Sequence, residues 1–140
     1  MQPAVKQKIL RSVLSLFATV FGWGAGFLCI LWYMKVTQGR VTDLPALGFW
    51  PGIFILAGWS FFFHPLVSWL PAEHPVFGPQ VFPLVGMGLA VVAYLLLVGT
   101  WMNGSVSSLF GYIYAAVAGG VAAFLYSLGN RALLYSARAS

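Results

Sequence analysis

The chain alternates between long apolar stretches and short polar segments. Four stretches are long enough to cross the hydrocarbon core of a bilayer, which needs about 20 helical residues: residues 12–34, 47–70, 84–102 and 106–128. Trp32, Trp50 and Trp101 lie near their ends, where aromatic rings favour the headgroup level. The pattern predicts an all-α integral membrane protein, formed by a single membrane domain of four transmembrane helices in an up-down bundle.

The middle of the chain, residues 61–83, interrupts this pattern. It contains both histidines and five of the eight prolines. Pro65 lies inside the second apolar stretch, where it removes a helical hydrogen bond to the carbonyl of Phe61 and is expected to kink the helix. Residues 71–83 are expected to form a stiff, proline-rich turn that acts as a hinge and a docking surface.

Composition supports the same class of protein. Hydrophobic residues make up 61% of the chain and charged residues 6%, whereas a soluble domain has about 25% charged residues. Most of the surface is therefore expected to face the lipid bilayer or other membrane protein subunits. The net charge of +5 is divided among separate short groups and forms no basic patch, so nucleic acid is not an expected partner. Cys29 is the lone cysteine, which excludes an internal disulfide.

The distribution of basic residues predicts how the helices are oriented. Five lysine and arginine residues lie near the two ends of the chain, and two, Lys35 and Arg40, lie in the first loop. Basic residues are enriched on the cytoplasmic side of membrane proteins, and four spans place both termini on one side. We therefore expect both termini and the central turn to be cytoplasmic, in a bacterial cytoplasmic (inner) membrane.

Small residues recur at helical spacing in two of the apolar stretches. The fourth stretch contains Gly111, Ala115, Gly119 and Ala123, and the first contains Ala18, Gly22 and Gly26. A spacing of four residues places small side chains on one helix face, which allows another helix backbone to approach closely. These seven residues are predicted to be helix-packing positions. The pattern leaves open whether they pack against each other or against a partner protein.

His64 is the one histidine inside an apolar stretch, and it is the candidate cofactor-binding residue. Intramembrane histidines ligate haem or chlorophyll-type pigments or relay protons. The simpler interpretation is a neutral imidazole that is hydrogen-bonded to a neighbouring carbonyl. The aromatic residues 61–63 could line a quinone or pigment pocket, but such rings more often face lipid or fill packing gaps. We expect no metal site, and no cofactor beyond this possible haem, pigment or quinone.

Glu73 and His74 bring a carboxylate and an imidazole together, but no nucleophile accompanies them. Neighbours in sequence seldom point toward the same substrate, so a solvated turn is the expected interpretation. With no catalytic residues predicted, the chain is not expected to be an enzyme.

Residues 78–83, with Gly78, Pro79 and Pro83, resemble a helix-start motif of the small four-span subunits of tripartite tricarboxylate transporters. The resemblance covers about six residues. In that family the motif precedes the second span, whereas here it precedes the third, and the charged middle loop of the family is missing. The resemblance implies a small subunit of a multi-component transporter.

The sequence thus favours a small non-catalytic accessory or structural subunit of a larger membrane protein complex, of respiratory, photosynthetic or transport type. The first alternative is a membrane subunit that binds a lipophilic cofactor through His64. The second is the transporter subunit.

Overall fold

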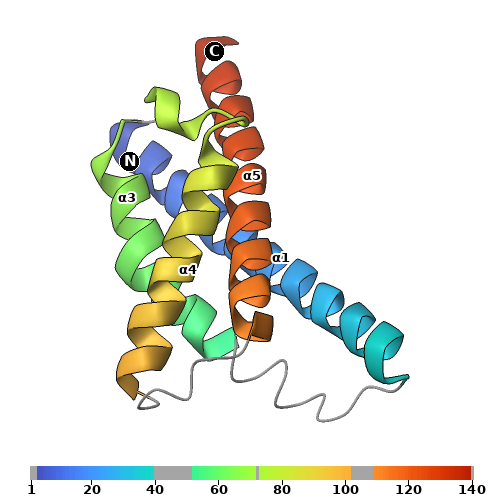
Figure 1. Ribbon diagram of the computed structural model, residues 1–140. Coiled ribbons are helices and arrows are strands. Elements are labelled where there is room, and N and C mark those ends of the chain that lie inside the picture. The colour runs from blue at the N-terminus through green and yellow to red at the C-terminus, as the bar shows by residue number, and fades with distance from the viewer. Residues whose placement is uncertain (1–2, 40–51, 72, 102–108, 140) are drawn as a thin grey trace.

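The computed structural model describes residues 3–39, 52–71, 73–101 and 109–139, and within these ranges it is helical with no strand. The four long helices are α1 (Pro3–Gln38), the helix Gly52–Trp69, α4 (Phe82–Trp101) and α5 (Leu109–Ala139). Successive helices run in opposite directions, and both ends of the chain lie toward the upper end of the bundle (Figure 1). The predicted all-α class and its four helices are confirmed.

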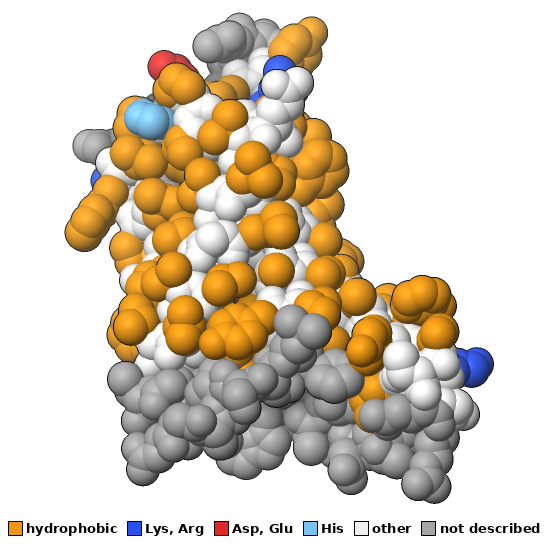
Figure 2. Space-filling view, in the orientation of Figure 1, with side chains coloured by type: hydrophobic (Ala, Val, Ile, Leu, Met, Phe, Trp, Pro, Cys, Tyr) orange, Lys and Arg blue, Asp and Glu red, His pale blue; other side chains and the backbone are white. Residues whose placement is uncertain are grey.

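Three of the described helices are long and apolar enough to cross a membrane: Val5–Thr37, Gly52–Trp69 and Tyr112–Ser136. The described apolar stretch of α4, Phe82–Leu96, is shorter. Figure 2 shows hydrophobic side chains over most of the visible face, whereas histidine and acidic side chains gather toward the upper end. A helical bundle with three candidate membrane-spanning helices is what the structure supports of the predicted membrane protein.

The central helix of the bundle is α5, which packs along α1 on one side and along α4 on the other. The reason lies in its small residues. Ala118, Ala122 and Ala123 are all buried, and they occupy two neighbouring faces of the helix, so that two other helices can approach its backbone. The sequence alone indicated one such face.

The first helix leaves the bundle in its last turns, after Ile30. The buried positions 11, 15, 18, 22, 26 and 30 recur at intervals of three or four residues, with Thr19 buried beside Ala18, and this is the period of a helix face. After Ile30 none of the described side chains of α1 is buried. In Figure 1 this part of α1 diverges from α4 and α5 toward the lower right.

The helix Gly52–Trp69 is irregular at its centre. Residues 52–58 are α-helical, a π turn follows at η1 (Trp59–Phe63), and α3 (His64–Trp69) completes the helix. The His64 N–H donates to the carbonyl of Trp59, five residues earlier. Proline has no N–H and its ring collides with the preceding turn of an α-helix, and a π turn is one way in which a helix absorbs such a defect. Pro65 thus gives a π turn on its N-terminal side.

The segment between α3 and α4 is folded onto the end of the bundle rather than forming only an exposed connector. Its 3-10 turn, η2 (Pro75–Phe77), ends in a side chain that is 2% exposed. The Ser127 hydroxyl of α5 donates to the carbonyl of Phe77 at 2.5 Å. Helix α4 begins at Phe82, two residues earlier than expected, and the Phe82 side chain is buried in the core.

Candidate functional site

A buried arginine lies where α1, α3, η2 and α5 meet. The Arg11 side chain is 8% exposed. Its Nε donates to the Tyr126 hydroxyl at 3.0 Å, and both terminal nitrogens donate to the carbonyl of Leu70 at 3.4 Å. Its guanidinium carbon lies 5.4 Å from the centroid of the Phe77 ring. Arg11 therefore connects elements that are far apart in the sequence.

The surroundings of Arg11 stabilise a cation without a carboxylate. Leu70 is the C-cap of α3, so its carbonyl lies at the negative end of a helix, where cations bind favourably. The face of the Phe77 ring adds a cation–π contact. Glu73 is exposed, and no ion pair with it is found among the described residues. These contacts are more typical of an arginine with a structural role than of one with a catalytic role.

Four aromatic rings pack directly behind Arg11. Tyr126 is fully buried and lies 5.6–5.7 Å from the rings of Phe63, Phe77 and Phe82. The Phe77 and Phe82 rings meet edge to face at 5.0 Å, a favourable arrangement of aromatic rings. These four rings fill the interior of the bundle next to Arg11. Of the residues proposed to line a quinone pocket, Phe63 belongs to this packed cluster, whereas Phe61 is 68% exposed on the outside.

His64, the candidate cofactor ligand, lies at a contact between α3 and α1. Its Nε2 is 3.2 Å from the Ser12 hydroxyl, and its ring meets the Trp59 ring at 5.1 Å. The Trp59 indole N–H donates to the Ser15 hydroxyl at 3.0 Å. A metal bound at Nε2 would displace Ser12, so the geometry favours a hydrogen-bonded imidazole, with a hydroxyl in place of the expected carbonyl.

The second histidine and its acidic neighbour face outward. His74 is exposed and its Nδ1 accepts a hydrogen bond from the Val76 N–H at 3.1 Å, which caps η2. This capping bond gives His74 a structural task in the turn. Within the described part of the chain, no group of three histidine, cysteine or acidic side chains is placed to hold a metal ion.

The predicted helix-packing residues lie in contacts within the chain. Gly22 faces α5 so closely that a Cβ atom there would overlap the carbonyl of Ala118, and a Cβ on Gly26 would lie 3.0 Å from the Tyr114 ring. A Cβ on Gly119 would overlap Gly86 and Ala90 of α4.

Of the other four positions, Ala18, Ala115 and Ala123 are buried, at 3%, 8% and 0% exposed. The side chain of position 111 lies outside the described residues. The notional Cβ of Gly86 would overlap Ala123, so Gly119 and Ala123 face α4, whereas Ala118 and Ala122 form a second face toward α1.

Sequence reasoning missed the roles of Arg11, Tyr126 and Ser127. Arg11 was read only as a charge that flanks the first span. A signal was present, since Arg11, Ser15, Ala18 and Gly22 follow one another at intervals of four, three and four residues. That spacing places the arginine on the same helix face as the small residues. No local pattern, however, identifies Tyr126 as its partner.

The chain matches no protein-family model, and no curated protein or solved structure matches it significantly. The resemblance of residues 78–83 to transporter subunits therefore gains no support from these comparisons.

Proposed function

We propose that this chain is a small non-catalytic subunit of a larger membrane protein complex. The support comes from two glycines that lie on outward-facing sides of their helices. At Gly24 of α1 and at Gly88 of α4, an added Cβ would meet no atom of the described residues within 4 Å. By contrast, a Cβ at Gly22, Gly86 or Gly119 would overlap a neighbouring helix. The protein thus carries close-packing glycines that its own bundle does not use.

An outward glycine costs a helix about 1 kcal/mol relative to alanine. On a lipid-facing surface it also offers fewer contacts than a larger side chain. Gly24 lies on the same helix face as Phe17, Phe21 and Leu28, which are 60%, 64% and 65% exposed. Gly88 lies beside Leu84, which is 69% exposed. A glycine between large apolar side chains leaves a gap in which another transmembrane helix can approach closely.

The diverging part of α1 supports the same proposal. Trp32 and Val36 are 67% and 64% exposed, in the part of α1 that diverges from α4 and α5 (Figure 1). A partner helix along this face would bury them. The buried Arg11 and the half-buried His64 both make polar contacts within the chain. Packing against other subunits is therefore the function that the exposed surface serves best.

Purification from native membranes in a mild detergent tests the proposal. We expect the unmodified chain to co-purify with other membrane proteins, and we expect Gly24→Leu and Gly88→Leu to lose them. Both variants should keep their helical circular dichroism and their monomer stability, because the new side chains enter open space.

The matched control is Gly22→Leu, two residues from Gly24 but facing α5. This variant should lower the stability of the chain itself. Full retention of partners by Gly24→Leu and Gly88→Leu, or purification of the unmodified chain without partners, would contradict the proposal.

A further inference from the structure

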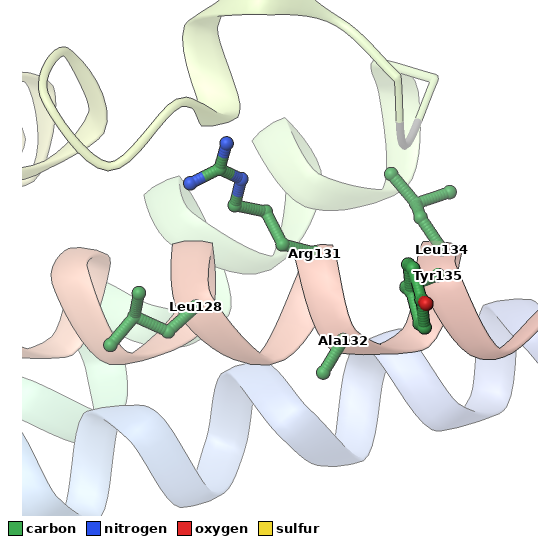
Figure 3. A pocket seen from close by; sticks show the side chains of 5 residues that line it. All are labelled: Leu128, Arg131, Ala132, Leu134 and Tyr135. Atoms are coloured by element: carbon green, nitrogen blue, oxygen red, sulfur yellow. The ribbon is translucent and has the colours of Figure 1, made fainter.

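The last turns of α5 carry an open hollow that includes neither Arg11 nor the outward-facing glycines Gly24 and Gly88. Its volume is about 590 Å³, and its lining residues are Leu128, Arg131, Ala132, Leu134 and Tyr135. Figure 3 shows all five on α5, with the Arg131 guanidinium pointing away from α1. The hollow combines one cation and one phenol with apolar side chains.

The hollow lies where α5, if it spans a bilayer along Tyr112–Ser136, would reach the headgroup region. Arg131 and Tyr135 lie in the final part of the candidate membrane span Tyr112–Ser136. Tyrosine and arginine are typical of this level, where an apolar body contacts the acyl chains and a polar tip reaches the headgroups. Tyr135 is 78% exposed and Leu128 is 43% exposed, so both are accessible from the bilayer.

The charge around the hollow favours an anion. Helices α1 and α5 are antiparallel, and a Cβ on Gly129 of α5 would touch Leu14 of α1. The exposed Lys6 and Lys8 therefore lie at the same end of the bundle as Arg131. The acid described at this end is Glu73, exposed in the turn before η2. A guanidinium can give two parallel hydrogen bonds to one phosphate.

We infer that the hollow binds the headgroup of an anionic phospholipid. The Arg131 guanidinium would hold the phosphate, the Tyr135 hydroxyl would donate to a headgroup oxygen, and Leu128, Ala132 and Leu134 would contact the start of an acyl chain. A net negative headgroup is favoured over a zwitterionic one, because the end of the bundle that carries Arg131 also carries the exposed Lys6 and Lys8 and therefore attracts excess negative charge.

Native mass spectrometry of the purified full chain with added lipid tests this site. The probes are phosphatidylglycerol and phosphatidylcholine with the same acyl chains. We expect retained phosphatidylglycerol on the unmodified chain and a loss of affinity of about tenfold in Arg131→Gln, as is typical for losing a hydrogen bond to a charged group. Tyr135→Phe should give a smaller loss.

Two controls separate a built site from diffuse attraction. Lys8→Gln removes one charge from the same end and should cause a clearly smaller loss of affinity than Arg131→Gln. Lys35→Gln removes one charge from the opposite end of α1 and should change the affinity by less than about twofold. An equal loss in Lys8→Gln and Arg131→Gln would overturn the site.

Equal retention of the two lipids would also overturn it, as would displacement of phosphatidylglycerol by millimolar inorganic phosphate alone, since the latter would mark a site for free anions. Loss of an acidic protein partner in Arg131→Gln, with lipid retention unchanged, would assign the hollow to a protein instead.

Discussion

Arg11 and Tyr126 are separated by 115 residues in sequence and joined by a hydrogen bond of 3.0 Å. The bond is buried, and the phenol supplies the neutral acceptor that the Nε of the guanidinium requires. Tyr126 also supplies one of the four rings of the aromatic cluster. A single side chain therefore serves both the apolar packing and the polar contact.

Tyr126→Phe separates these two tasks, because it keeps the ring and removes the acceptor. We expect it to lower the stability of the chain by about 1.5–3 kcal/mol, the range for a buried hydrogen bond to a charged group. Unfolding by a denaturing detergent, followed by tryptophan fluorescence or circular dichroism, measures this.

Tyr135→Phe is the matched control for stability, since that tyrosine is 78% exposed; it should leave the unfolding curve unchanged. Equal stability of Tyr126→Phe and the unmodified chain would show that the Leu70 carbonyl and the Phe77 ring suffice to hold Arg11.

At the scale of elements, α5 determines how the helices pack, because it has two faces of small residues. Ala118 and Ala122 meet Gly22 of α1, and Gly119 and Ala123 meet Gly86 of α4. In lipid there is little hydrophobic drive for helices to associate, so close backbone contact carries much of their affinity. These contacts explain why α1 and α4 both pack on α5.

Gly119→Ala tests the contact between α5 and α4. A methyl group there would overlap the Gly86 backbone and Ala90, so the helices must separate. We expect a loss of stability of about 1–3 kcal/mol, the usual cost of overpacking a close contact, measured by the same unfolding assay.

Gly88→Ala is the control on the open face of α4. No atom lies within 4 Å of the added Cβ, and alanine is the better helix former by about 1 kcal/mol. This variant should be as stable as the unmodified chain or slightly more so. If Gly119→Ala were equally well tolerated, the approach of α4 and α5 would not depend on the glycine.

At the scale of the whole molecule, the basic side chains that the structure describes are divided unevenly between the two ends of the bundle. Lys6, Lys8, Arg11 and Arg131 lie toward the end that holds both termini, and Lys35 lies in the last turn of α1, at the other end. Because basic residues favour the cytoplasmic side, we expect both termini to be cytoplasmic.

Reporter fusions at the two ends test this orientation. Green fluorescent protein, which matures in the cytoplasm, should fluoresce on either terminus, whereas alkaline phosphatase, which needs an oxidising compartment, should be inactive on both. Opposite results at the two ends would mean an odd number of spans, and active phosphatase at both ends would invert the predicted orientation.

Much of the element level could be predicted from the sequence. The four helices, their apolar character, the irregularity near Pro65 and the turn after Leu70 all follow from local rules, because helix formation depends on neighbours within a few residues. The element bounds differ at two helix ends. Helix α4 starts at Phe82, two residues before the expected start, and α5 continues to Ala139, beyond the expected end at residue 128.

By itself, the sequence determined that this chain forms long apolar helices with small-residue faces and a basic bias toward its two ends. The tertiary structure decided which of those faces meet. Gly22 and Gly24 look alike in sequence, yet one touches α5 and the other faces outward. The structure also shows that Arg11, which in the sequence only flanks an apolar stretch, is buried and hydrogen-bonded to Tyr126. The physical reason is that helix–helix pairing depends on contacts between residues far apart in the chain, which no local pattern records.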